Sequence, residues 1–400
     1  MTPLNGGGAS GNGKPRVLIV DDEPDVETLV RQRFKRRAAE FDFDFARNGR
    51  EALEKISGDP SLDVVVTDIN MPEMDGLALL NQLNRLDGRV VKTVILSAYG
   101  DMQNIRSAMN LGAFDFLTKP IDFADFESTL RRTGQALNAT REGIEARERL
   151  TALEQELDIA AQIQASMLPR EFEPGRKDFG IFAAMQPARR VGGDFYDFFL
   201  IDEKRLGFAI GDVSGKGIPA ALFMAVSRTL LRATALQGIE PGKCLQYENQ
   251  VLRGQREGGV YVTAFYAILH TDTGLLEYAL GGHNPPYRVS AAGEIEEIAE
   301  PAGMVIGLLP DGYGTPYETG RLQLNANDLI LLYTDGVTEA QNEAQKFFGE
   351  KRLRTALKEL AGQAPQTTVE QILGSVETFV AGAAQSDDIT VLGVKWTPGE

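Results

Sequence analysis

Acidic side chains follow two short apolar runs near the start of the chain. Asp21 and Asp22 come directly after the first run, and Asp68 follows the second. Crowded carboxylates repel each other unless a divalent cation lies among them, and hard oxygen ligands favour Mg²⁺. Asp68 is the expected nucleophile, because an aspartate can carry a phosphoryl group as an acyl phosphate. Lys119 would neutralise the phosphate charge, and Ser97 would donate a hydrogen bond to a phosphoryl oxygen.

Four further acids lie in glycine-rich motifs of the second half. The motifs are Gly-Gly-Asp-Phe-Tyr-Asp, Gly-Asp-Val-Ser-Gly-Lys-Gly, Tyr-Thr-Asp-Gly-Val-Thr-Glu and Ser-Asp-Asp-Ile-Thr, and the acids are Asp194, Asp212, Asp335 and Asp387. Glycine lets a backbone or a metal ion approach closely. Four carboxylates without a soft ligand suit two Mn²⁺ or Mg²⁺ ions about 3.5–4 Å apart, which hold a water and clamp a phosphate. The motifs therefore predict metal-dependent hydrolysis of a phosphoester.

The composition removes several other chemistries and partners. Cys244 is the only cysteine, and His270 and His283 are the only histidines, so neither an intramolecular disulfide nor a histidine-rich zinc centre can form. The 57 acids against 41 bases give a formal charge of −16, which argues against a nucleic-acid surface. No apolar run approaches the roughly 18 residues of a membrane span. We expect a cytoplasmic protein with no nucleic-acid or membrane partner.

Strands and helices alternate in the N-terminal part of the chain. Five β-like runs are separated by helix-length segments, and they cover residues 16–20, 41–45, 64–68, 94–97 and 114–117. Such alternation predicts an open parallel α/β sheet. Ligands of these sheets lie beyond the carboxyl ends of the strands. That geometry would gather Asp21, Asp22, Asp68, Ser97 and Lys119 into one cleft.

Residues 123–167 are expected to form one helix rich in charged residues, alanine and leucine. Leu130, Leu137 and Ile144 fall seven residues apart, and a second apolar series that begins at Leu150 is out of phase with the first. This heptad pattern with a phase break predicts a parallel coiled coil and hence a homodimer. The alternative is an amphipathic helix packed on its own domain.

Short β-like runs with glycine turns predominate after Pro169. Strand candidates cover residues 208–210, 262–269, 275–280, 329–333 and 389–394, and helix candidates cover 218–237, 351–360 and 368–382. Because strands outnumber helices, we expect an α+β sandwich of sheets flanked by helices. The expected organisation is a disordered leader (1–14), an α/β domain (15–130), a helical linker (131–169) and the α+β domain (170–400).

The N-terminal motifs resemble the receiver domain of two-component response regulators. The matching strings, in order, are VLIVDDEPD, VVVTDINMPEMDG, ILSAYG and GAFDFLTKP. The resemblance implies a flavodoxin-like fold, phosphorylation of Asp68 by a sensor histidine kinase, and one Mg²⁺ held by Asp21 and Asp22. The magnesium and switch roles would fall to Asp21, Asp22, Asp68, Asn70, Ser97, Phe116 and Lys119. Ser97 departs from the threonine usual in the family.

The C-terminal motifs, with Gly-His-Asn-Pro-Pro at 282–286, resemble bacterial PPM-type Ser/Thr phosphatases (protein phosphatase 2C-like) of the SpoIIE and RsbU kind. The resemblance implies two Mn²⁺ or Mg²⁺ ions, bridged by Asp194 and Asp212. The full ligand set would be Asp194, Asp212, Asp335, Asp387 and the carbonyl of Val213. The implied substrate is a phosphorylated anti-sigma factor antagonist of the STAS fold, in partner-switching control of transcription.

Five residues near these motifs need separate interpretation. His283 fits a rigid turn or a proton donor, and Asp197 fits a surface acid or a residue supporting the ligands. Lys216 fits a solvated helix start or a phosphate contact. Met224 fits a core position, on a helix that the resemblance makes a candidate switch element. Asp388 is not expected to bind metal directly.

The combined interpretation is a protein phosphatase controlled by phosphorylation of Asp68. The receiver would alter the dimer helix, which would reposition the helix at 218–237 beside the metal site. The alternative is a catalytically weak PPM-fold adaptor that binds and sequesters a partner under receiver control. A diguanylate cyclase is suggested by Gly-Gly-Asp-Phe-Tyr, but the motif lies too close to the linker helix and the later motifs have no place in a cyclase.

Overall fold

The computed structural model describes residues 14–35, 40–86, 88–169, 176–253, 259–308 and 317–398. The leader expected at residues 1–14 lies outside these ranges, apart from Lys14. The chain forms two compact units, Met1–Ala152 and Leu153–Glu400. No helix in the described ranges combines the length and the apolar character needed to cross a bilayer.

A five-stranded parallel sheet with the order β2-β1-β3-β4-β5 forms the centre of the first unit. Its strands are β1 (Arg16–Val20), β2 (Asp42–Ala46), β3 (Leu62–Asp68), β4 (Lys92–Ala98) and β5 (Asp115–Lys119). The continuous apolar runs of β1, β3 and β4 are buried, as expected for a parallel sheet covered on both faces. This confirms the doubly wound α/β fold predicted from the sequence.

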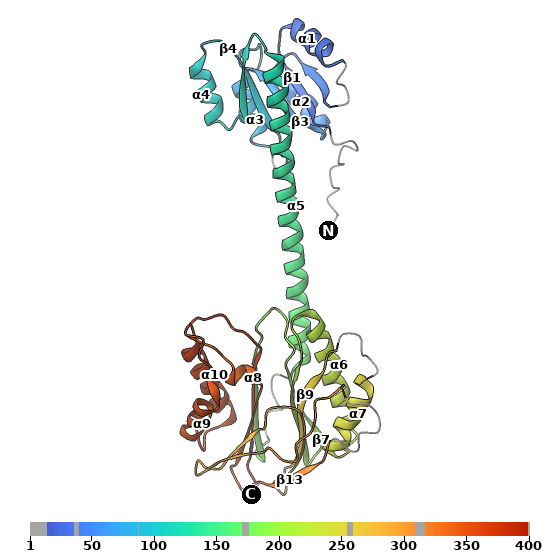
Figure 1. Cartoon of the computed structure of the whole chain (residues 1–400), viewed down its shortest axis with the longest axis vertical. Coiled ribbons are helices and arrows are strands. Elements are labelled where there is room, and N and C mark those ends of the chain that lie inside the picture. Colours follow the sequence, from blue (N-terminus) through green and yellow to red (C-terminus); the bar gives the residue numbers. More distant parts are fainter. Residues whose placement is uncertain are drawn as a thin grey trace. The chain divides into compact units, whose positions relative to one another are not determined.

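Helices cover both faces of this sheet (Figure 1). The helices α1 (Pro24–Phe34) and the first part of α5 (Phe123–Met167) pack on one face. On the other face lie α2 (Gly49–Gly58), α3 (Gly76–Leu83) and α4 (Met102–Asn110). The starts of α2 and α3 are fixed by side-chain caps, because Asn48 accepts a hydrogen bond from the Glu51 N–H and Asp75 accepts one from the Ala78 N–H.

The helix α5 is continuous over 45 residues, and its surroundings change along its length. Leu130 and Leu137 are buried in the core of the first unit. Leu150 and Leu153, beyond the phase break, are more than half exposed at 57% and 51%. The first part of the heptad series therefore packs on its own domain, as the alternative interpretation held. The exposed second part stays a predicted dimer contact.

Two five-stranded antiparallel sheets face each other in the second unit. One has the order β13-β10-β9-β8-β7, with β7 (Phe195–Asp202), β8 (Arg205–Val213), β9 (Val262–His270), β10 (Leu275–Gly281) and β13 (Gly320–Gln323). The other has the order β12-β11-β14-β15-β6, with β6 (Phe179–Gln186), β11 (Tyr287–Val289), β12 (Ile295–Glu297), β14 (Leu329–Tyr333) and β15 (Ile389–Trp396). This confirms the predicted α+β sandwich.

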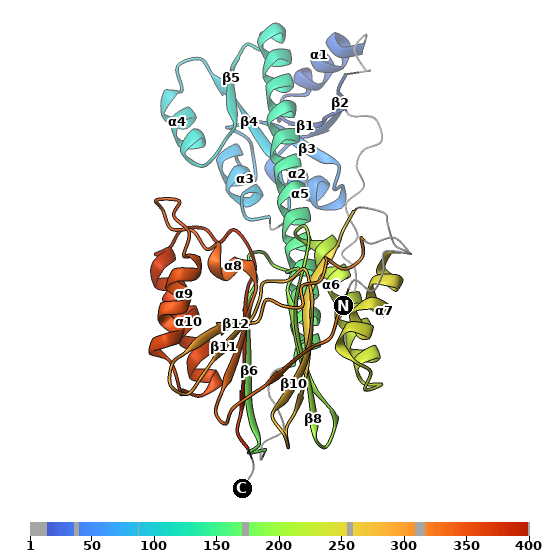
Figure 2. The same cartoon turned by 60° about the horizontal axis from the view of Figure 1, so that its bottom comes forward.

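Helices flank the outer faces of the sandwich (Figure 2). On the first sheet lie α6 (Ile218–Ala235) and α7 (Pro241–Arg253), and on the second α9 (Gly349–Glu359) and α10 (Pro365–Val380). The short helix α8 (Asp335–Thr338) follows β14 directly. Sequence analysis missed α7, α8 and the strands β6, β7 and β11–β13, of which β11–β13 span only three or four residues each. The predicted ligands lie in the loop between β6 and β7, at the ends of β8 and β14, and within residues 385–388.

Candidate active and metal sites

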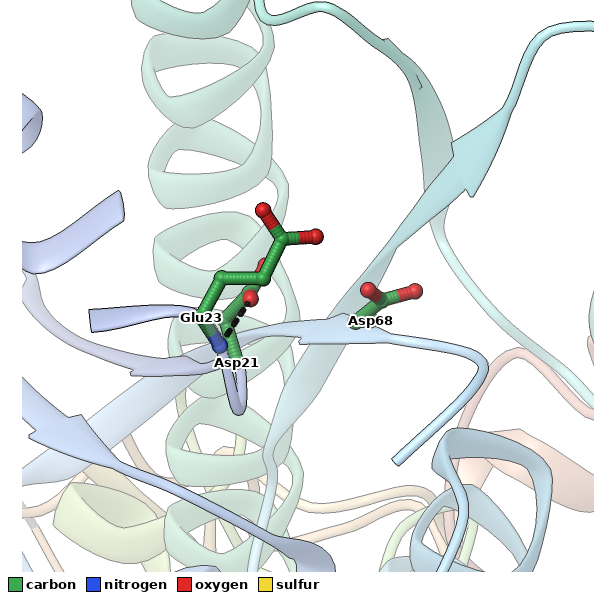
Figure 3. Close-up of side chains that lie close together, drawn as sticks. All are labelled: Asp21, Glu23 and Asp68. Carbon is green, nitrogen blue, oxygen red and sulfur yellow. Dashed lines mark hydrogen bonds between the residues drawn. The ribbon is translucent and has the colours of Figure 1, made fainter. Parts of the chain in front are cut away.

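Three carboxylates meet at the carboxyl edge of the parallel sheet (Figure 3). They belong to Asp21, Glu23 and Asp68, and one oxygen of each lies within 4.8 Å of the other two. Asp21 follows β1 and Asp68 ends β3, and these adjacent strands form the switch point of the fold, where ligands bind. The Glu23 N–H donates a hydrogen bond of 2.9 Å to Asp21 Oδ1, which shapes the loop. Such an oxygen set suits Mg²⁺.

Lys119 at the end of β5 is directed into this group. Its Nζ lies 2.9 Å from Asp21 Oδ2, 3.2 Å from Glu23 Oε1 and 2.5 Å from Asp68 Oδ2. Burial opposes the charged form, but the hydrogen bonds to Asp68 and Asp21 outweigh it and raise the pKa of Lys119. Burial raises the pKa of Asp21, against the opposing hydrogen bond from Lys119. The lysine is thus a permanent cation at the predicted phosphorylation site.

The remaining predicted receiver residues surround this group at different depths. Asp22 is exposed and is not among the three converging acids, whereas Glu23, which sequence analysis missed, is. The sequence offered one signal for Glu23, because it is the third consecutive acid of the Asp-Asp-Glu-Pro loop. Asn70 is exposed, and its backbone N–H donates to Asp68 Oδ1 at 3.3 Å. The roles of Asp22 and Asn70 stay predictions.

Ser97 and Phe116 lie on the neighbouring strands β4 and β5. Asp68 is paired with Leu96, so Ser97 lies one residue beyond that pairing. Ser97 is buried, and its hydroxyl has no hydrogen-bond partner among the described residues. The side chain of Phe116 is 39% exposed. A free buried hydroxyl and a partly exposed ring are compatible with the predicted switch pair.

In the second unit Asp194 connects the two sheets of the sandwich. It precedes β7, and its Oδ2 accepts hydrogen bonds from Thr334 Oγ1 at 2.7 Å and from Thr390 Oγ1 at 2.6 Å. Thr334 precedes α8, and Thr390 lies in β15 of the opposite sheet. Burial and then the nearby Asp212 carboxylate raise the pKa of Asp194 well above its usual value. The structure therefore holds one buried acid rigidly beside another.

The other three predicted ligands interact electrostatically with one another around Asp194. Burial and then the Asp335 carboxylate raise the pKa of Asp212 to about 6, and Asp387 contributes further. Burial, Glu339 and Asp387 raise the pKa of Asp335. Asp212 lies in β8, Asp335 begins α8 and Asp387 precedes β15, so segments far apart in sequence converge. The four acids therefore lie near enough to influence one another, and their role as metal ligands stays a prediction.

The donor set at this acidic centre fits divalent cations, although the oxygens are more widely spaced than in the first unit. Within the described ranges, Asp21, Glu23 and Asp68 form the only group of three or more acids, cysteines or histidines whose ligand atoms all lie within 4.8 Å. At the second centre the carbonyl of Val213 lies beside Gly193, where an added Cβ would be 2.8 Å from that oxygen. The ligands are hard oxygens, the carboxylates repel one another without a cation, and the glycines allow close approach to the carboxylates. These three features favour Mn²⁺ or Mg²⁺.

Asp388 supports the centre through the backbone. It is buried, and its carboxylate accepts hydrogen bonds from the N–H groups of Ala188 (2.7 Å), Gly193 (2.6 Å) and Asp194 (3.3 Å). An added Cβ at Gly192 would be 2.5 Å from its Oδ2. Asp388 thus fixes the loop that carries Asp194. Sequence analysis did not assign this role, because the bonded groups are about 200 residues away.

Lys216 neutralises one of the predicted ligands. It precedes α6 and is half-exposed, as one interpretation held, but its Nζ lies 2.9 Å from Asp387 Oδ2 and donates to the Ser386 carbonyl at 2.6 Å. If Asp387 binds a metal ion as predicted, Lys216 competes with that ion for the Asp387 carboxylate. The phosphate-contact interpretation of Lys216 stays a prediction.

Asp197 anchors the helix α6 to the sheet. It is completely buried, with Arg232 Nη1 2.6 Å from Oδ1 and Arg228 Nη2 3.0 Å from Oδ2. The surface interpretation of Asp197 is therefore wrong, because two arginines of α6 reach it. Met224 on the same helix is buried, which confirms its predicted core position.

His283 is buried beside the first sheet, 2.9 Å from Thr263 Oγ1 through its Nδ1. Burial lowers the pKa of His283 to about 4, so the imidazole is neutral near pH 7. A buried neutral ring fits the turn interpretation better than that of a proton-donating imidazolium.

Comparisons with known proteins identify both domains. Residues 17–131 match the family model "Response regulator receiver domain", and residues 202–397 match "Stage II sporulation protein E (SpoIIE)". The chemotaxis protein CheY of Treponema pallidum is 37% identical over 117 residues, which cover 29% of this chain and 80% of CheY. The phosphoserine phosphatase RsbU of Bacillus subtilis is 31% identical over 224 residues, which cover 56% of this chain and 65% of RsbU. The chain thus spans less than two thirds of the length of RsbU.

One solved structure shows the fold of the second unit independently. The SiaA-PP2C domain of Pseudomonas aeruginosa superposes with a TM-score of 0.55 at 24% identity, covering 62% of this chain and 98% of that domain. The likeness supports a PP2C-type sandwich, in agreement with the observed pair of sheets.

Proposed function

We propose that this chain, which belongs to the response regulator family and carries a SpoIIE-type phosphatase domain, hydrolyses phosphoserine or phosphothreonine in a partner protein under the control of Asp68. The main support is the convergence of three acids from distant segments near the buried Asp194. The similarity to the phosphoserine phosphatase RsbU supports the same activity.

The acidic centre would hold two Mn²⁺ or Mg²⁺ ions through Asp194, Asp212, Asp335, Asp387 and the carbonyl of Val213. When bound, such ions lower the pKa of a water and polarise phosphate oxygens for in-line attack. The chain's own contribution is rigid positioning. Thr334 and Thr390 fix the Asp194 carboxylate, and Asp388 fixes the preceding backbone. Hydrolysis adds water across the phosphorus–oxygen bond, restores the serine or threonine hydroxyl of the partner protein and releases inorganic phosphate.

The receiver would supply the control. A sensor histidine kinase would phosphorylate Asp68, with Mg²⁺ held by Asp21 together with Asp22 or Glu23. Lys119, which already contacts Asp68, would then neutralise the phosphoryl group, and the free hydroxyl of Ser97 would donate to it. Exposed apolar residues of α5 from Leu150 onward would form the dimer contact through which the signal reaches α6. The proposed substrate is a STAS-type anti-sigma factor antagonist, in the cytoplasm.

The activity is tested by phosphate release from p-nitrophenyl phosphate and from a phosphoserine protein, with the full chain and Mn²⁺. We expect Asp335→Asn to lower both rates by about a hundredfold or more, because it removes a charged ligand. Asp272→Asn, an exposed acid paired with Lys204, is the matched control and should retain the wild-type rate. Full activity of Asp335→Asn would contradict the proposal. A wild-type chain that binds a phosphoprotein without hydrolysing it would favour the adaptor.

The receiver's control is tested with Asp68→Asn. Treatment of the wild type with acetyl phosphate should change its rate of hydrolysis by about fivefold or more, because coupled sites typically differ by that much. Asp68→Asn should show one constant rate and retain the metal-dependent activity. Asp25→Asn, an exposed acid at the start of α1, should still respond. A response of Asp68→Asn equal to that of the wild type would show that the coupling does not pass through Asp68.

A further inference from the structure

A pocket of about 270 Å³ adjoins the acidic centre on the side of α8 and α10. Its wall includes Asp387 itself and Gly336, the residue after Asp335. The pocket therefore borders the proposed ligand Asp387. Its volume lies below that of typical drug-sized ligand sites, which run to about 300–1,000 Å³, and suits a single side chain.

The wall of this pocket is mixed, with polar side chains on one part and an apolar patch on another. Val376 and Val380 line it from α10, Ile389 from the start of β15 and Ala340 from the segment after α8. Val376, Ile389 and Ala340 are buried. Burial of a ligand's apolar surface against these side chains would be favourable by about 25 cal/mol per Å².

The charge of the wall excludes one class of side chain. Glu377 and Asp387 are the charged residues among those that line the pocket in the described part of the chain. Lys216 pairs with Asp387, so Glu377 is the wall charge that an entering aspartate or glutamate would meet, and this like charge is unfavourable. The apolar patch and Glu377 together favour an apolar residue over an acidic one at this wall.

Hydrogen bonds hold the segment between the pocket and the centre in place. The side chain of Gln385 donates to the carbonyls of Gln186 (2.8 Å) and Asp387 (2.7 Å). Lys216 donates to the carbonyl of Ser386 at 2.6 Å. Because this wall is already fixed, little conformational entropy is lost when a ligand binds, and this improves affinity.

We propose that this pocket binds an apolar side chain close in sequence to the phosphorylated residue of the substrate protein. The inference rests on the proposed phosphatase function and names the specificity of that site. The phosphoryl group would lie at the four acids, with Lys216 at the boundary, while the neighbouring apolar residue fills the space between α8 and α10. Substrates would then be selected by a residue other than the one hydrolysed.

The test measures kcat/KM of the full chain with Mn²⁺ on synthetic phosphoserine peptides. In the set, each of the three residues on either side of the phosphoserine is in turn leucine or aspartate. At one position we expect a preference for leucine of about tenfold or more, the size typical of one well-filled apolar contact combined with charge exclusion. Equal rates for leucine and aspartate at every position would overturn the inference.

Two variants assign the preference to the pocket. Ala383→Trp fills it from the segment after α10 and should reduce the preference to less than about twofold, whereas Ala384→Trp, the adjacent exposed residue that does not line the pocket, should retain it. Glu377→Lys changes only an exposed wall residue and should improve the aspartate peptide relative to the leucine peptide. An unchanged preference in folded Ala383→Trp, or in Glu377→Lys if the first does not fold, would overturn the inference.

Hydrolysis of p-nitrophenyl phosphate separates the two proposals, because this substrate has no flanking residue. Wild-type hydrolysis of it without peptide selectivity would overturn the pocket inference alone. Absence of hydrolysis of every substrate would overturn the proposed function and this inference with it.

Discussion

Replacing Asp212 by asparagine is expected to abolish hydrolysis and, in metal-free buffer, to make the second unit more stable. Burial and neighbouring carboxylates hold the pKa of Asp212 at about 6, compared with 3.8 for a free side chain. At pH 7 the folded protein therefore keeps a charge that the fold disfavours, and neutralising it should stabilise the unit by about 1–3 kcal/mol. The rate should fall by about a thousandfold, because a proposed metal ligand would be lost.

Opposite changes in activity and stability distinguish a metal ligand from a structural acid. Unfolding is followed by the fluorescence of Trp396, the only tryptophan of the chain, which lies in the second unit. Mn²⁺ should raise the unfolding temperature of the wild type and leave that of Asp212→Asn nearly unchanged, because binding stabilises only a protein that holds the ion. Asp272→Asn should behave as the wild type. A metal-free Asp212→Asn that unfolds at a lower temperature would show that the carboxylate stabilises the fold by itself.

Both folds were predictable because their strongest signals are local. The runs at β1, β3 and β4 are continuous and apolar, so their burial in a parallel sheet followed from the sequence. Because β1 and β3 are neighbours in the sheet, the strand order alone places Asp21 beside Asp68. In the second unit, glycines beside acids marked the loops that approach each other, and Gly193 does lie against the carbonyl of Val213.

The parts that were missed depend on contacts between distant segments. The heptad spacing of Leu130 and Leu137 is the same whether they face a second helix or their own sheet, and the structure places them in the receiver core. Asp197 could not be recognised as buried, because its partners are two arginines more than 30 residues away. Asp388 accepts bonds from the loop before β7, which sequence analysis did not connect with it. Local sequence patterns predict helices and strands, whereas the tertiary fold determines which polar side chains pair with each other.

Glu248 on α7 is a further acid whose burial has a large energetic consequence. It is completely buried, and neither carboxyl oxygen accepts a hydrogen bond from any described residue. Cys244, Tyr317 and Tyr266 are also buried, and the pKa of each is raised, mainly by burial, with Glu248 contributing at Cys244 and Tyr317. No cation is among the contributors to the Glu248 shift, and burial raises the pKa of Glu248 to about 8. Glu248 is therefore protonated in the folded protein at neutral pH.

Glu248→Gln is expected to stabilise the second unit increasingly as the pH rises from 5 to 8. The unfolded chain releases the Glu248 proton above about pH 4.5, whereas the folded chain keeps this proton until about pH 8. The free energy of unfolding of the wild type therefore falls as the pH rises through this interval. The neutral amide removes that dependence, and the difference should grow to roughly 3–5 kcal/mol at pH 8 and stay below about 1 kcal/mol at pH 5. Urea unfolding followed by Trp396 fluorescence measures it, with the exposed Glu240→Gln at the start of α7 as the control that should match the wild type. A constant difference between the Glu248→Gln variant and the wild type across this pH range would mean that Glu248 is ionised in the folded protein, with a partner that neutralises it.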